Sequence, residues 1–159
     1  MNPLLQEFNT PFSTAPFGQI KKEHYLPALK EALVEAKETI KKIGRQRKPP
    51  TFENTLEELE NSTDRVDLIS EIFFNIHSAE ADDGIQEIAK EFSPLLAEFS
   101  NHITHDAKLF LRIKQLFEKK DELSLAVEQK TLLERTYQEF IRGGALLDKR
   151  AKNKFKKID

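Results

Sequence analysis

The sequence predicts an all-α fold: an antiparallel bundle or array of about five to six helices, preceded by an extended arm rich in Pro and Phe. Charged residues make up 33% of the 159 residues, and only 5 residues are Gly. Glu, Lys, Leu and Ala, which lose little entropy in a helix, dominate the composition. Apolar residues also recur at spacings of three and four, as they do on one face of a helix.

The length and composition exclude several classes of protein. A chain of 159 residues suits one helical domain with a real core, because chains of this size bury roughly 70% of their unfolded surface. The formal net charge of −2 argues against a nucleic-acid partner. No apolar stretch approaches the ~20 residues that span a bilayer. The chain has no Cys, which excludes disulfides and thiol catalysis. We expect a cytoplasmic protein, with export as the alternative if a leader once preceded Met1.

Residues 2–20 predict the extended arm, because three prolines and a glycine are too closely spaced for a helix. Phe8, Phe12 and Phe17 indicate that this arm lies on the body of the domain. The first helix is expected from about 22 to 43, with Gly44 as its end and Pro27 tolerated in its first turn. Its apolar stripe consists of Tyr25, Leu29, Ala32, Leu33, Ala36, Ile40 and Ile43.

The second helix should begin near 52–54, with Thr51 or Asn54 as its cap, and run to about 79. A polar interruption at 61–63 allows a bend in it. The third helix follows a turn at 81–84 that supplies Asp82 or Asp83 as a cap. We expect Pro94 to kink this third helix.

A fourth helix is predicted at about 106–119 and a fifth at about 125–142, the latter ending at Gly143 and Gly144. A sixth begins at Asp148 and carries the apolar residues Ala151, Phe155 and Ile158. No Gly, Pro or polar tail ends it. We therefore expect the natural polypeptide to continue beyond Asp159.

No set of residues predicts a catalytic, cofactor-binding or metal-binding site. His102 and His105 have a spacing that could hold a metal on a continuous helix, but they fall where one helix should end and the next begin. We favour exposed loop histidines, and we read His24 and His77 as surface or interface residues. The acids at 80–83 fail the alternation that a calcium loop requires and suit helix capping instead.

Two basic stretches, 45–48 and 149–157, could attract an anionic partner. A solvated helix face, or a face that meets missing polypeptide, is the favoured interpretation over nucleic acid. The sequence also contains no Gly-x-Ser-x-Gly nucleophile turn and no Gly-rich phosphate loop. Nothing in these residues alone goes beyond a helical domain of unassigned function.

Several segments together resemble the N-terminal region of the peptidyl-dipeptidase branch of the thimet-oligopeptidase-like zinc metallopeptidases. Their order and spacing carry the resemblance more than any one of them does. The stretch 61–65 departs from the Ser-Gly and apolar pattern expected there. The matching segments are 2–5, 10–12, 16–17, 23–29, 49–56, 73–80, 92–96, 109–113 and 140–147.

The resemblance implies that residues 1–159 are the N-terminal helical domain of a larger peptidase, forming one wall of a deep channel. Members bind zinc through His-Glu-x-x-His and a downstream Glu, and this branch removes C-terminal dipeptides from short peptides. The chain lacks that motif. The resemblance therefore implies a catalytic zinc domain beyond residue 159, short peptides as substrates of the whole enzyme, and no zinc or catalysis in this part.

Two alternatives remain at this point. The chain could be a stand-alone helical module for protein interaction, in which case the polypeptide would end near Asp159. More remotely, it could be a one-domain metalloenzyme that uses His102 and His105. Metal binding that is lost on His105→Ala would favour the second alternative.

Overall fold

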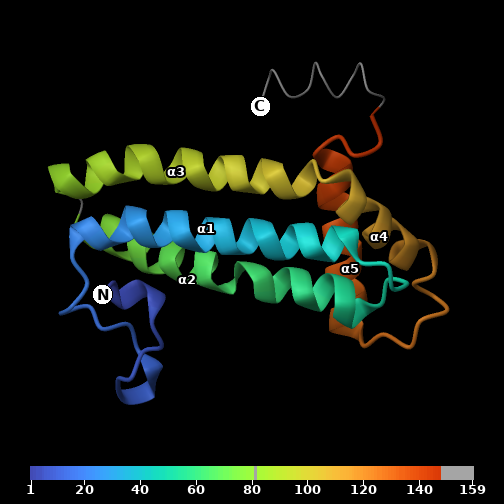
Figure 1. The fold of residues 1–159 in the computed structure, drawn as a ribbon, viewed down its shortest axis with the longest axis horizontal. Helices are drawn as coiled ribbons and strands as arrows, with labels where there is room; N and C mark the ends of the chain where they lie inside the picture. Colours follow the sequence, from blue (N-terminus) through green and yellow to red (C-terminus); the bar gives the residue numbers. More distant parts are fainter. Residues whose placement is uncertain (81, 148–159) are drawn as a thin grey trace. The chain divides into compact units, whose positions relative to one another are not determined.

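The computed structural model describes residues 1–80 and 82–147, and this part of the chain is helical and contains no strand (Figure 1). The predicted all-α class is thereby confirmed. The sixth predicted helix falls in 148–159, outside the described residues. Within the described residues the five α-helices are α1 (Lys22–Arg45), α2 (Glu58–Ala79), α3 (Asp83–Thr104), α4 (Ala107–Glu118) and α5 (Val127–Arg142).

The chain folds into two compact units. Of the described residues, unit 1 contains Met1–Glu38 and Ser62–Phe99, and unit 2 contains Thr39–Asn61 and those from Ser100 to residue 147. The helices α4 and α5 lie wholly in unit 2, whereas α1, α2 and α3 each have one end in either unit. Among the described residues, no helix is both long enough and apolar enough to cross a membrane.

Within unit 1, ion pairs establish that α1 and α3 run parallel. Lys30 contacts Glu91 at 2.5 Å, and Lys37 contacts Glu98 at 3.2 Å. Both partners advance by seven residues, which is two helical turns on each helix. The pairs are exposed and add little stability, but they fix the register of the two helices.

The helix α2 runs antiparallel to α1 in the same unit. The rings of Tyr25 and Phe73 are 5.2 Å apart, while Arg65 contacts Glu35 at 3.4 Å. An early residue of α1 thus meets a late residue of α2, and a later one meets an earlier one. Consecutive helices are antiparallel here, as predicted.

Two phenylalanines form the centre of unit 1. Phe73 of α2 and Phe92 of α3 are both fully buried, with rings stacked 4.2 Å apart at 19°. Tyr25 packs edge-on against Phe73, and its burial raises the pKa of the phenol above its ordinary value. Aromatic pairs of this kind add roughly 0.5–1.5 kcal/mol beyond the area they bury.

The N-terminal arm lies on the body of unit 1, as predicted. It contains two short 3-10 turns, η1 (Pro3–Leu5) and η2 (Pro11–Ser13). Leu4 is the buried anchor at 2% exposure, and the side-chain Nδ2 of Asn2 donates to the backbone carbonyl of His24 at 2.8 Å. Phe12 is fully exposed and Phe17 is half exposed. The buried anchor of the arm is therefore Leu4, and the fully exposed Phe12 takes no part in it.

The apolar stripe predicted for α1 is buried along its whole length. Two details of the helix were predicted wrongly. Helix α1 continues through Gly44 to Arg45, and Pro27 lies in its second turn, not its first. A Cβ at Gly44 would lie 3.3 Å from the Leu109 backbone nitrogen and from the Lys108 Cβ. This glycine therefore permits the close approach of α4 instead of ending α1.

The cap and interior of α3 were predicted in part. Asp82, one of the two predicted caps, accepts from the Ile85 amide at 3.0 Å. Its carboxylate also pairs with Lys22, and the hydrogen bond from Lys22 lowers the pKa of Asp82 below its ordinary value. The helix continues through Pro94 as one segment, and Figure 1 draws it without a break.

In unit 2, α4 and α5 pack through stacked rings. Phe117 and Tyr137 lie 3.9 Å apart at 9°, and Phe110 stacks on the buried Phe140 at 5.8 Å. The helix α5 ends at Arg142 with Gly143 as its C-cap, as predicted, and a Cβ at Gly143 would lie only 2.8 Å from the Thr104 Cβ. Close packing against the end of α3 thus requires glycine at this position.

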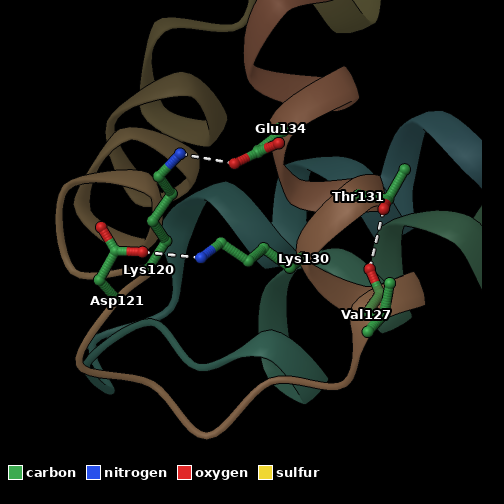
Figure 2. A network of polar contacts seen from close by, with 6 residues as sticks. All are labelled: Lys120, Asp121, Val127, Lys130, Thr131 and Glu134. Atoms are coloured by element: carbon green, nitrogen blue, oxygen red, sulfur yellow. Dashed lines mark hydrogen bonds and ion pairs between the residues drawn. The ribbon is translucent and has the colours of Figure 1, made fainter.

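The connection between α4 and α5 is fastened to α5 by two ion pairs (Figure 2). Lys120 contacts Glu134 at 2.5 Å, and Lys130 contacts Asp121 at 2.7 Å. The second pair lowers the pKa of Asp121 and raises that of Lys130, chiefly through their shared hydrogen bond. Both pairs therefore tie the start of the loop, just after α4, to α5.

Replacing a central ring of unit 1 tests this description of its core. We expect Phe92→Ala to lower the free energy of unfolding by about 3–5 kcal/mol, because it leaves a cavity between α2 and α3. Phe12→Ala is the matched control, and it should change that free energy by no more than about 0.5 kcal/mol because Phe12 is fully exposed. Chemical denaturation followed by circular dichroism measures both. Equal effects would contradict the assignment of the core.

Candidate functional site

The histidines singled out from the sequence are not gathered into a site. The His24 Nδ1 accepts the Lys21 amide at 3.0 Å, so this side chain caps the start of α1. His77 packs beside the ring of Phe73, with ring centres 6.1 Å apart. His102 lies exposed in the last turn of α3, and His105 follows the end of that helix.

No group of three or more His, Cys, Asp or Glu side chains among the described residues could hold a metal ion. The second basic stretch, 149–157, lies outside the described residues.

The first basic stretch does border a groove, in unit 2. This basic groove has a volume of about 440 Å³ and lies between the end of α1, the loop that follows it, and one face of α4. Four of its ten lining residues are cationic, and none is acidic. They are Gly44, Gln46, Arg47, Lys48, Pro49, Pro50, Lys108, Leu111, Arg112 and Gln115.

Arg112 of α4 holds the loop side of the groove in place. It is only 6% exposed. Its Nη1 donates to the carbonyls of Lys48 at 3.0 Å and Gln46 at 3.4 Å. Its Nη2 donates to Asn54 Oδ1 at 2.7 Å and to Thr55 Oγ1 at 3.0 Å. One guanidinium therefore ties the groove loop and the next helical turn to α4.

Asn54 is the second centre of this arrangement. Besides Arg112, its Oδ1 accepts from the Thr51 amide at 2.9 Å and the Thr55 hydroxyl at 2.8 Å. Its Nδ2 donates to the Pro49 carbonyl at 3.0 Å. The Thr51 hydroxyl in turn accepts from the Asn54 amide at 3.2 Å, which completes a capping box. Both predicted caps of this helix thus act together.

This capped turn is η3 (Phe52–Glu57), a π-helical turn that leads into α2. Such turns are rare in proteins and occur mostly as single turns within α-helices. Here Asn54 and the fully buried Thr55 both come within hydrogen-bonding distance of Arg112. The turn therefore supplies the two side-chain acceptors that a buried guanidinium needs.

The electrostatic environment of Arg112 reflects its burial. Desolvation lowers the pKa of the guanidinium from its ordinary value, and the negative charge of Glu58 partly opposes that effect. The group remains charged at neutral pH, because arginine is not deprotonated in proteins. Its Nε is buried and has no hydrogen-bond partner among the described residues. Of the three guanidinium nitrogens of Arg112, only the two Nη atoms donate hydrogen bonds to described protein groups.

A second cavity, of about 460 Å³, lies in unit 1 where the arm meets the first turn of α1. Tyr25 and Phe17 line it, together with the ion pair of Lys22 and Asp82. Its lining mixes cationic and acidic side chains, Lys21 and Lys22 with Glu23, Glu80 and Asp82. The basic groove is the stronger candidate for binding a charged ligand because its lining has cations and no acidic residue.

Sequence reasoning noticed the basic stretch 45–48 but did not identify Arg112. The signal was present in the spacing. Arg112 follows Leu109 by three residues and precedes Leu116 by four, so it falls on the buried stripe of α4. A charged residue at such a position predicts a buried polar network, since an unpaired buried charge is costly.

The chain was compared with known proteins, and no family model matches it. It is 31% identical to dipeptidyl carboxypeptidase of Escherichia coli over all 159 of its residues. It is also 31% identical to the Salmonella typhimurium dipeptidyl carboxypeptidase over 158 residues, which is 99% of this chain. It is 27% identical to oligopeptidase A of Escherichia coli over 157 residues.

These matches cover only 22–23% of the relatives' own lengths, so the chain spans about a quarter of the peptidases it resembles. They confirm the resemblance drawn from the sequence and are consistent with an N-terminal region of that family. Two of the segments that carry the resemblance, 49–56 and 109–113, meet at the hydrogen bonds of Arg112. The residues of these two segments that resemble the family therefore contact each other inside the domain.

Substituting Arg112 tests whether it holds the groove loop. We expect Arg112→Met to lower the free energy of unfolding by about 2–4 kcal/mol, because buried acceptors lose their donor. Hydrogen exchange of the Thr51 amide should also become faster, since that amide donates to Asn54.

The matched control is Arg65→Met, which breaks an exposed pair at 3.4 Å and should cost no more than about 1 kcal/mol. If both variants had the same stability, Arg112 would not be the clamp described here.

Proposed function

We propose that this chain, which is related over its whole length to dipeptidyl carboxypeptidase and oligopeptidase A, is the N-terminal helical region of a zinc metallopeptidase. In this proposal the whole enzyme removes C-terminal dipeptides from short peptides in the cytoplasm. The chain forms part of the channel wall that limits access to the catalytic centre. It contributes shape and no catalytic group.

The single observation that carries the proposal is the match to peptidases over the full length of the chain and about a quarter of theirs. The higher identity to the dipeptidyl carboxypeptidases, 31% against 27% for oligopeptidase A, favours the dipeptide-releasing branch. The helical fold of the described residues is compatible with the largely helical architecture that the resemblance implies.

The described residues do not fit the zinc that the family implies. They offer no group of three or more suitable ligands, and the His24 Nδ1 is already engaged by a backbone amide. A zinc ion in the whole enzyme would polarise the peptide carbonyl and activate water. In our proposal that chemistry belongs to polypeptide outside these 159 residues.

The stand-alone interaction module remains the second candidate, and the basic groove is the observation that favours it. The two candidates differ in what the coding region contains after residue 159. The peptidase requires several hundred further codons, including a His-Glu-x-x-His helix. The module requires none.

The peptidase proposal is tested with the whole natural protein and with the 159-residue chain. We expect the whole protein to release C-terminal dipeptides from short peptides, to contain one zinc per chain, and to lose activity with a chelator. The chain alone should cleave nothing and bind no stoichiometric zinc. His102→Ala and His105→Ala should leave the zinc content of the whole protein unchanged. Zinc or chelator-sensitive cleavage in the chain alone would sink the proposal.

A further inference from the structure

We propose that the basic groove of unit 2 binds an acidic, extended peptide segment, with its exposed cations pairing with carboxylates and its apolar rim contacting a side chain of that segment. This inference concerns the groove itself and does not depend on the proposed peptidase function. It follows from three properties of the groove: its charge, the rigidity of the loop that forms it, and its mixed polar and apolar lining.

The charge of the groove is one-sided in a chain that is otherwise balanced. The formal net charge of the chain is −2, yet the lining combines Arg47, Lys48, Lys108 and Arg112 with no acidic residue. The first three side chains are exposed, and no described residue forms an ion pair with them. A concave surface lined by one sign of charge raises the local concentration of opposite charge.

The backbone that carries two of these cations is already fixed before any ligand arrives. Arg112 holds the Lys48 carbonyl at 3.0 Å, and Asn54 holds the Pro49 carbonyl at 3.0 Å. Pro49 and Pro50 also restrict the backbone on their own. On α4, the close approach of Gly44 to the Leu109 backbone and the Lys108 Cβ fixes the backbone that carries the third cation. Binding to such a loop costs little ordering entropy, which favours affinity.

The lining favours a peptide over a small inorganic anion. Leu111 is 56% exposed and lies in the groove with the two prolines, which gives an apolar surface beside the cations. The volume of about 440 Å³ falls within the ~300–1,000 Å³ typical of sites for organic ligands. Carboxylates for the cations and one apolar side chain for Leu111 together describe an acidic peptide with an embedded hydrophobic residue.

The test uses the 159-residue chain and a labelled peptide of sequence Glu-Glu-Leu-Glu-Glu, with binding followed by fluorescence anisotropy. The variant Arg47→Gln/Lys48→Gln/Lys108→Gln removes the exposed cations and leaves the buried Arg112 in place. Each lost exposed pair should weaken binding about two- to five-fold, so the triple variant should bind about ten- to hundred-fold more weakly. Raising the salt concentration should weaken binding to the unmodified groove.

The matched control is Lys30→Gln/Arg65→Gln/Lys90→Gln, which removes three exposed positive charges from unit 1. It is needed because the cations in 149–157 attract acidic peptides without specificity, and both triple variants keep them. The control should bind the peptide as the unmodified chain does. Thermal unfolding confirms that both variants are folded, and Gln-Gln-Leu-Gln-Gln serves as the neutral peptide.

Four results would overturn the proposal. They are no binding at millimolar peptide, equal weakening in the two triple variants, displacement of the peptide by equimolar inorganic phosphate, and tighter binding of a short oligonucleotide than of the peptide. The first two would leave the groove without a specific ligand. The last two would assign it to a small anion or to nucleic acid. Leu111→Ser should also weaken binding, because the proposal places an apolar side chain of the peptide against Leu111.

Discussion

The burial of one charge, on Arg112, is the constraint on which the arrangement of unit 2 depends. A guanidinium that is 6% exposed must find acceptors inside the protein, because leaving a buried charge unpaired is far more costly than pairing it. It finds them in the carbonyls of Gln46 and Lys48 and in Asn54 and Thr55. The loop, the π-helical turn and α4 therefore have to form together.

Much of the fold could be predicted from periodicity. The stripe from Tyr25 to Ile43 is buried as expected, and the helices begin and end near their predicted bounds. The errors arise where tertiary contacts decide. Gly44 reads as a helix end, but it is present because α4 approaches within 3.3 Å of where its Cβ would be. The arm lies on the domain as its aromatic residues indicated, but its buried anchor is Leu4, and Phe12 is fully exposed. Local sequence patterns contain no information about such distant contacts.

The basic groove was only partly visible in the sequence. The charges at 45–48 were noticed, but the groove also needs Lys108 and Leu111, which come some sixty residues later. Two of the segments that carry the family resemblance are likewise far apart in the sequence and meet in the fold. These segments, 49–56 and 109–113, are joined by the hydrogen bonds of Arg112, so they mark how the chain folds. Among the described residues, no group of three or more His, Cys, Asp or Glu side chains could hold a metal ion.

A double-mutant cycle between Arg112 and Asn54 tests the central claim most directly. The free energies of unfolding of Arg112→Met, Asn54→Ala and the double variant are measured against the unmodified chain. Because the two side chains share a hydrogen bond of 2.7 Å within one buried network, we expect a coupling free energy of about 1.5–3 kcal/mol. Additive effects, within about 0.5 kcal/mol, would contradict the view that Arg112 organises unit 2 through this network.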